Sequence, residues 1–170
     1  METPPGQRAL SEQRAVQVMV PMVTVPEDMD RARSVVESAA HELGIAYIPP
    51  LVAIIETPAA ALSVSDILRS ADALSIGTND LTQYVMAAGR QNPLANEYFR
   101  EDHPAMMRLI RIICQDAGAA TVGMCGELAG RLQVIPDLLR AGIRLFSVAP
   151  RLIPLVKEAV RRAKAAPKPA

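Results

Sequence analysis

Short, continuously apolar segments alternate along this chain with longer segments whose apolar residues recur at helical spacing. The five apolar segments, which we predict to be strands, are residues 16–23, 51–55, 73–76, 120–124 and 144–148. Strands that are apolar along their whole length are buried on both faces, so the alternation predicts an α/β fold with a parallel sheet covered by helices. The pattern alone fits both a section of a closed barrel and an open doubly wound sheet.

One domain, residues 15–162, contains all of these strands and the helices between them. A chain of 170 residues that is 50% hydrophobic can bury a core of ordinary single-domain size. The segments 1–14 and 163–170 lack a periodic apolar face, and we expect them to be mobile ends. The second helix is predicted over 58–69, and the polar segment 91–103 has the length of a functional loop.

Composition excludes several classes of function. Lys and Arg number 18, as do Asp and Glu, so no net field favours nucleic acid or anionic lipid. Aromatic residues are 3% of the chain and Trp is absent, which leaves no stacking platform for single-stranded nucleic acid. No apolar run reaches the length of a membrane span, and residues 1–14 lack the apolar core of a signal peptide. We expect a cytoplasmic protein without nucleic-acid or membrane partners.

Two carboxylates follow neighbouring predicted strands at the points where the strands end. Glu56 comes directly after strand 51–55, and Asp80 follows strand 73–76. The carboxyl ends of parallel strands meet at one edge of a sheet, and oxygen ligands suit a hard divalent ion, so the pair predicts a magnesium site. Each acid taken alone has a simpler interpretation, as a cap or first-turn residue of the following helix.

A predicted helix start lies beside these acids. The backbone amides of 77–80 and the helix dipole favour an anion there, with Asn79 next to it, although a turn containing an Asx residue has the same composition. Arg90 supplies a planar cation suited to a carboxylate or phosphate, whereas alone it reads as a solvated surface arginine.

The two cysteines, Cys114 and Cys125, match neither a zinc-site spacing nor a disulfide framework. Cys125 follows the fourth predicted strand between Gly123 and Gly126, which allow a ligand or backbone to approach closely. A cysteine beside apolar residues is usually an inert core residue. We apply that interpretation to Cys114, which lies inside a predicted helix and outside any motif.

Three motifs together resemble those of a known family. They are I-I-E-T-P-A-A at 54–60, D-A-L-S-I-G-T-N-D-L-T-Q-Y at 72–84 with Arg90 after it, and G-M-C-G-E-L-A-G at 123–130. These motifs resemble the C-terminal barrel of the phosphoenolpyruvate-utilising enzymes, above all phosphoenolpyruvate-protein phosphotransferase, enzyme I of the bacterial sugar phosphotransferase system. Pyruvate phosphate dikinase and phosphoenolpyruvate synthase resemble it more distantly. The resemblance implies that the five βα units are the last five of a TIM-type barrel.

The resemblance also implies a role for each candidate residue. Glu56 and Asp80 would hold Mg²⁺, while Asn79, Asp80 and Arg90 would bind phosphoenolpyruvate. Cys125 would donate the proton that converts enolpyruvate to pyruvate. Relatives often carry Asp where this chain has Gly89, so the hinge of the arginine is expected to be looser here.

A magnesium-dependent, phosphoenolpyruvate-binding part of a phosphotransferase is the activity that this resemblance implies. His41 and His103 are the only histidines, and neither has the setting of a phosphoacceptor, so the acceptor histidine would lie outside this chain. The implied partners are a phosphohistidine domain and a phosphocarrier protein. The resemblance also implies a homo-oligomer that associates through the helices between residues 83 and 117, and the isolated chain is not expected to transfer phosphate.

Two other functions remain open at this point. One is a truncated, non-catalytic module that binds or dimerises with a full-length relative, because the open edges of a partial barrel favour association. The other is a magnesium-dependent lyase or aldolase of the pyruvate type. The run from Asn79 to Arg90 resembles the phosphotransferase motif far more closely than a lyase.

Overall fold

The computed structural model describes residues 16–89 and 93–165 of the chain, and it contains one five-stranded sheet. The strands are β1 (Val18–Val23), β2 (Leu51–Ile55), β3 (Ala73–Gly77), β4 (Val122–Cys125) and β5 (Leu145–Phe146). All neighbouring pairs are parallel, in the order β1-β2-β3-β4-β5. A doubly wound sheet reverses its strand order at a switch point. The uninterrupted order therefore confirms the α/β prediction and identifies a section of a barrel.

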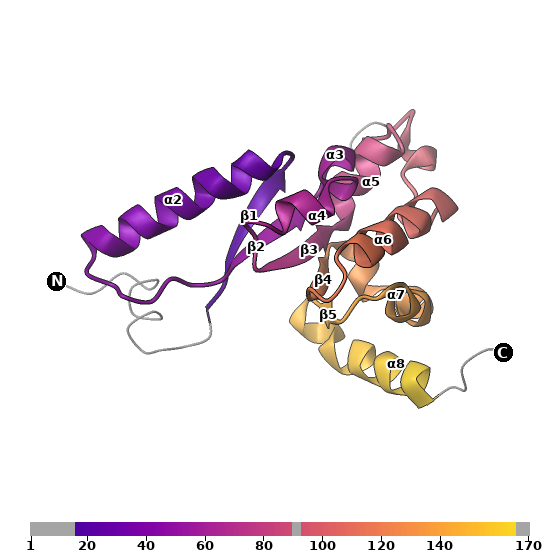
Figure 1. The fold of residues 1–170 in the computed structure, drawn as a ribbon. Helices are drawn as coiled ribbons and strands as arrows, with labels where there is room; N and C mark the ends of the chain where they lie inside the picture. The colour runs from indigo at the N-terminus through magenta and orange to yellow at the C-terminus, as the bar shows by residue number, and fades with distance from the viewer. Residues whose placement is uncertain (1–15, 90–92, 166–170) are drawn as a thin grey trace.

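Helices follow the strands as expected, and most lie along one side of the curved row of strands (Figure 1). The α-helices are α2 (Pro26–Glu42), α3 (Pro58–Ala61), α4 (Val64–Ile67), α5 (Thr78–Val85), α6 (Pro104–Asp116), α7 (Ile135–Ala141) and α8 (Ile153–Ala165). Short 3₁₀ turns are η1 (Asn96–Tyr98), η2 (Glu127–Gly130), η3 (Leu132–Val134) and η4 (Pro150–Leu152). Within the described ranges, no helix is both long and apolar enough to span a membrane.

The core lies between the three central strands and the helices packed on them. Its largest fully buried side chains include Leu51, Ile55, Leu74, Ile76 and Met124 from the strands, and Met29, Ile67, Leu81, Met106, Ile110 and Ile113 from the helices. Burying a side chain of this size stabilises a fold by about 1.5–3 kcal/mol. This packing fixes the carboxyl ends of β2, β3 and β4 relative to one another.

Several local predictions were wrong. The fourth and fifth strands, predicted over 120–124 and 144–148, are Val122–Cys125 and Leu145–Phe146. The helix predicted over 58–69 is divided into α3 and α4, because Ser63 has φ −122° and ψ 23° and interrupts the helical backbone. The first strand is not buried throughout: Met19 and Met22 are 44% and 45% exposed, since β1 is an edge strand with a neighbour on one side only in the described sheet. The predicted mobile segment 1–14 lies outside the described residues; of the predicted mobile tail 163–170, residues 163–165 form the end of α8 and 166–170 lie outside the described residues.

Candidate functional site

The strand register brings most of the predicted site residues to one edge of the sheet. Ile55 lies beside Ile76, and Gly77 lies beside Cys125. Glu56 and the first turn of α5 therefore meet at the carboxyl ends of their strands, with Cys125 on the next strand. Arg90 lies outside the described residues.

Glu56 is held by the backbone of the neighbouring strand. The amide of Met22 donates to Glu56 Oε2 at 2.8 Å. β1 has a bulge between Val20 and Val23, and Met22 adopts φ +54° there. A non-glycine residue in this left-handed region costs roughly 1–2 kcal/mol, and such bulges often redirect groups at functional sites. The strained bulge directs a hydrogen-bond donor to the carboxylate, which fixes its orientation.

The capping interpretation of Glu56 is wrong. Thr57 is the N-cap of α3, and its Oγ1 accepts from the amide of Ala60 at 3.2 Å. Glu56 Oε1, in contrast, accepts no hydrogen bond from the described residues and lies above Gly77. Glu56 is therefore oriented at the site edge and does not cap the helix that follows it.

Glycine at position 77 allows the side chain of Glu56 to approach the backbone closely. A Cβ atom added to Gly77 would lie 2.5 Å from Glu56 Cγ and 2.6 Å from Glu56 Oε1, too close for any real contact. The backbone of Gly77 has φ −89°, which any residue can adopt. A side chain here would displace the carboxylate without straining its own backbone.

We expect Gly77→Ala to weaken Mg²⁺ binding by about 10- to 100-fold, the usual effect of losing the support of a metal ligand. Isothermal titration calorimetry with MgCl₂ measures this affinity. Gly89→Ala is the matched control, because a Cβ at Gly89 meets no atom within 4 Å. Wild-type affinity in Gly77→Ala would contradict the proposed role of Glu56.

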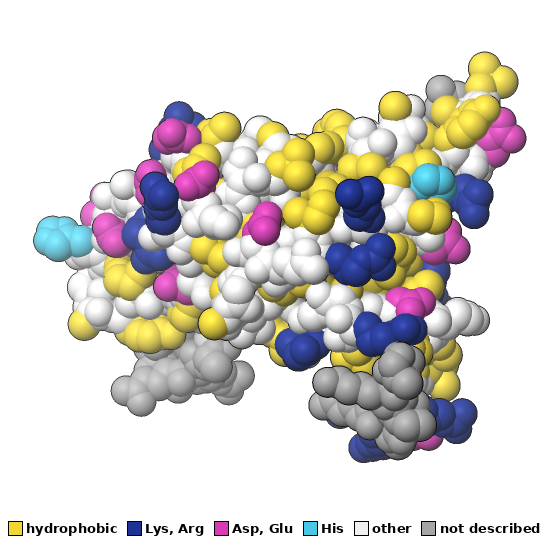
Figure 2. Space-filling view, turned by 45° about the vertical axis from the view of Figure 1, so that its right-hand side comes forward, with side chains coloured by type: hydrophobic (Ala, Val, Ile, Leu, Met, Phe, Trp, Pro, Cys, Tyr) yellow, Lys and Arg dark blue, Asp and Glu magenta, His cyan; other side chains and the backbone are white. Residues whose placement is uncertain are grey.

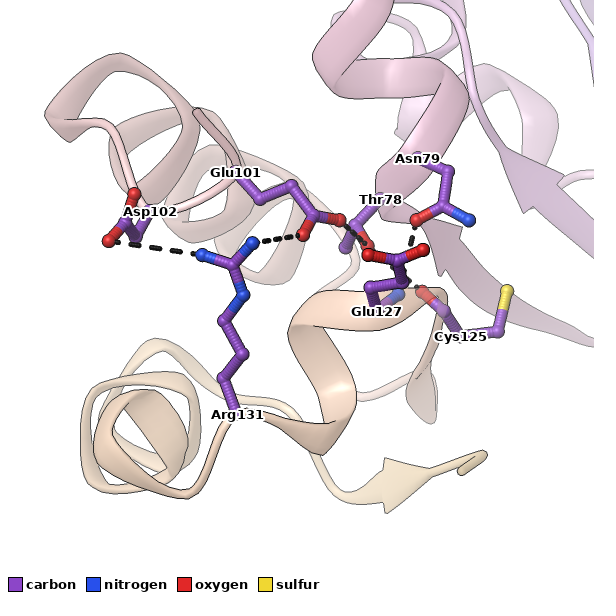
Figure 3. Close-up of polar contacts among 7 residues, drawn as sticks. All are labelled: Thr78, Asn79, Glu101, Asp102, Cys125, Glu127 and Arg131. Atoms are coloured by element: carbon purple, nitrogen blue, oxygen red, sulfur yellow. Dashed lines mark hydrogen bonds and ion pairs between the residues drawn. The ribbon is translucent and has the colours of Figure 1, made fainter. Parts of the chain in front are cut away.

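The N-terminus of α5 lies beside Glu56, since the Glu56 side chain packs over Gly77. Gly77 is its N-cap and makes no side-chain capping bond, and Asp80 lies in the first turn. Asn79 Oδ1 accepts from the amide of Glu127 at 3.1 Å. The carboxamide oxygen is thus engaged, and in Figure 3 the carboxamide nitrogen lies on the side away from Glu127. This nitrogen and the α5 amides can donate to an anion.

Cys125 is the last residue of β4, and its side chain is held by residues of β3. Its sulfur lies 3.6 Å from the carbonyl oxygen of Ile76, which accepts from the thiol, and 3.6 Å from the hydroxyl of Ser75, which donates to it. These two contacts orient the sulfur, and the residue as a whole is half-buried. Cys114 differs: burial raises the pKa of its thiol to about 11, although the charge of Arg144 opposes the shift. An un-ionised thiol is a poor nucleophile, which supports the inert interpretation of Cys114.

Sequence reasoning missed a buried polar cluster behind these residues (Figure 3). The Glu101 side chain is fully buried. Its Oε1 accepts from Thr78 Oγ1 at 3.0 Å, and its Oε2 accepts from Arg131 Nη2 at 2.9 Å. Thr78 lies inside the motif at 72–84 and Arg131 directly follows the motif at 123–130, but Glu101 lies in the polar segment between these two motifs. Nothing in that segment distinguishes a buried acid from a solvated one.

His103 has the structural role predicted for it. It is the N-cap of α6, and its Nδ1 accepts from the amide of Ala105 at 3.2 Å. His41 is exposed near the end of α2.

The carboxylates predicted for this edge are compatible with Mg²⁺. The described residues contain no group of three or more His, Cys, Asp or Glu side chains able to hold a metal. Mg²⁺ usually takes one or two carboxylates and completes its octahedron with water and substrate oxygens. Glu56, with one oxygen fixed by Met22 and the other not hydrogen-bonded by described residues, fits that requirement.

The matching family model and three curated relatives all describe phosphoenolpyruvate-utilising enzymes. The family described as "PEP-utilising enzyme, PEP-binding domain" matches residues 7–165. A protein of Methanocaldococcus jannaschii named "Probable phosphoenolpyruvate synthase" is 32% identical over 153 residues, which is 86% of this chain and 12% of that protein. The phosphoenolpyruvate-protein phosphotransferases of Cupriavidus necator and Haloferax volcanii are 36% and 38% identical, over 87% and 84% of this chain. The chain spans 26% of each of those two proteins.

Solved structures share the fold. A citrate lyase from Burkholderia xenovorans superposes with a TM-score of 0.64 at 21% identity, over 86% of this chain and 48% of that one. An aldolase/citrate lyase family protein from Burkholderia cenocepacia gives 0.58 at 18% identity, over 94% and 68%. Identities this low show a common fold alone, so these neighbours support a barrel section and do not favour lyase activity.

Proposed function

Because the chain belongs to the PEP-binding domain family of the PEP-utilising enzymes, we propose that it is the magnesium-dependent, phosphoenolpyruvate-binding part of a phosphotransferase. The observation that carries this proposal is the meeting of an oriented carboxylate, Glu56, with the N-terminus of α5 and an oriented thiol, Cys125, at one sheet edge. An anionic substrate needs donors and counter-charge, and conversion to pyruvate needs a proton.

Each residue then has a defined task. Glu56 and Asp80 hold Mg²⁺, which when bound neutralises phosphate charge. Asn79 and the α5 amides donate to the substrate oxygens, and Arg90 is proposed to pair with its carboxylate or phosphate. The phosphoryl group passes to a histidine outside the described site. The enolate left behind takes the proton from Cys125 Sγ at its methylene carbon, which gives pyruvate and a thiolate that water reprotonates.

The rest of the reaction is proposed to come from a longer assembly, because the chain spans 12–26% of the relatives described above. That assembly would supply the phosphohistidine domain and bind the phosphocarrier protein. Association of two copies through residues 83–117 is supported by exposed apolar side chains: Tyr84, Leu94 and Tyr98 are 47%, 89% and 58% exposed. Hydrophobic side chains also gather along the upper right of the molecule in Figure 2.

Calorimetric titration of phosphoenolpyruvate into the full 170-residue chain tests the proposal. We expect binding in the presence of MgCl₂ and a loss of at least about tenfold in affinity when EDTA removes the ion. Pyruvate, which lacks the phosphate, is expected to bind more weakly. Absence of binding in MgCl₂, or binding that EDTA does not change, would contradict the proposed function.

A further inference from the structure

The buried carboxylate of Glu101 joins two segments that are far apart in sequence. One of its oxygens accepts from Thr78 at the start of α5, and the other accepts from Arg131 after η2. An ionised carboxylate is costly to bury unless it is paired and fully hydrogen-bonded. Arg131 supplies this pairing, and its guanidinium also lies 4.0 Å from Asp102. The ion pair therefore holds the loop before α6 against the carboxyl ends of β3 and β4.

Thr78 receives its orientation from this pair. Its hydroxyl has one proton to donate, and two acceptors lie within reach: Glu101 Oε1 at 3.0 Å and the carbonyl oxygen of Cys125 at 3.3 Å. A carboxylate is the stronger acceptor, because its hydrogen bond is assisted by charge. Glu101 thus determines where the Thr78 hydroxyl lies, and the carbonyl of Cys125 packs against it.

Close packing transmits this orientation to Asn79. A Cβ atom on Gly126 would lie 2.4 Å from Thr78 Oγ1 and 3.0 Å from Asn79 Oδ1. The next residue, Glu127, donates its amide to Asn79 Oδ1 at 3.1 Å. Thr78 Oγ1 and Asn79 Oδ1 therefore both pack over Gly126, so a shift of Thr78 is expected to displace the turn at Gly126 and to weaken the hydrogen bond that holds Asn79.

We propose that Glu101 and Arg131 are positioning residues for the anion-binding side of the site. They act through Thr78 and Gly126 to fix the carboxamide of Asn79 and the carbonyl of Cys125, and they do not contact the substrate themselves. The effect on phosphoenolpyruvate binding rests on the function proposed above. The effect on the Asn79–Glu127 hydrogen bond does not.

A double variant separates positioning from stability. Glu101→Leu combined with Arg131→Met replaces the buried pair by apolar groups, an exchange that is often neutral or favourable for folding. We expect a thermal midpoint close to that of the wild type. We also expect the Glu127 amide to exchange with deuterium at least about tenfold faster, and phosphoenolpyruvate to bind about 10- to 100-fold more weakly. If the Glu101–Arg131 pair had a structural role alone, a double variant of wild-type stability would also show wild-type exchange at Glu127 and wild-type affinity for phosphoenolpyruvate.

Two further variants make the test decisive. Arg140→Met with Asp137→Leu removes an exposed ion pair on α7 and is expected to change neither property.

Thr78→Val keeps the Glu101–Arg131 pair but removes the hydroxyl, so it is expected to reproduce the faster exchange at Glu127 even if the double variant does not fold. Exchange within twofold of the wild type in Thr78→Val would overturn the inference. If the wild-type chain does not bind phosphoenolpyruvate, the proposed function fails, and exchange at Glu127 still decides the positioning role.

Discussion

Arg131→Met is expected to lower the free energy of unfolding by about 3 kcal/mol, the low end of the range for breaking a buried ion pair. Glu101 is fully buried, so removal of the cation leaves an unpaired carboxylate in the protein interior. The loss stays near the low end because the Arg131 side chain is 42% exposed and water already reaches part of it. Urea denaturation measures the change as a lower midpoint with an unchanged slope.

Arg140→Met is the matched control for this prediction. It makes the same chemical change at an exposed pair, since the side chains of Arg140 and Asp137 are 62% and 51% exposed. Exposed pairs contribute about 0–1 kcal/mol, because water solvates both partners in the folded and unfolded states. Equal losses in the two variants would show that the burial of Glu101 does not set the energy of its pair.

The predicted fold follows largely from local pattern. β2 has the predicted bounds, and β3 differs by one residue, because each apolar run ends where polar residues begin. The order of the strands in space was not given by their apolar character, which fits a doubly wound sheet equally well. The motifs at 54–60, 72–84 and 123–130 favoured the barrel order, because they resemble those of the phosphoenolpyruvate-utilising enzymes, whose C-terminal domain is a barrel.

Features that depend on contacts between distant segments were not predictable. The bulge at Met22 places an amide within hydrogen-bond distance of Glu56, 34 residues further along the chain. Glu101 is buried because Thr78 and Arg131, 23 and 30 residues away, satisfy its two oxygens. Periodicity over a short window contains no information about either pairing.

The site itself was predictable where chemistry and topology coincide. Polar residues directly after parallel strands share one edge of a sheet, so the sequence alone predicts that Glu56 and Asn79 lie at the same edge. The supporting groups could not be predicted in this way: Ser75 reads as a polar interruption of a strand, although it is buried and contacts the sulfur of Cys125. Sequence therefore predicts which polar groups share this edge of the sheet better than it predicts the groups that orient them.

Glu56→Ala and Asp80→Ala are each expected to weaken Mg²⁺ binding by at least about 100-fold, beyond the 10- to 100-fold effect of losing a supporting group. Mg²⁺ retains several waters and takes few protein ligands, so a single remaining carboxylate gives too little negative charge to hold the hydrated ion. Calorimetric titration with MgCl₂, repeated with MnCl₂, measures both affinities.

Glu127→Ala controls for the general loss of a negative charge near the site. Glu127 is exposed, and it is its backbone amide that bonds Asn79, so truncation of its side chain leaves that hydrogen bond in place. We expect it to bind Mg²⁺ as the wild type does. Unchanged affinity in both Glu56→Ala and Asp80→Ala would exclude them as ligands. A loss in Asp80→Ala alone would place the ion at the start of α5. Glu56, which the amide of Met22 orients, would then not be a metal ligand.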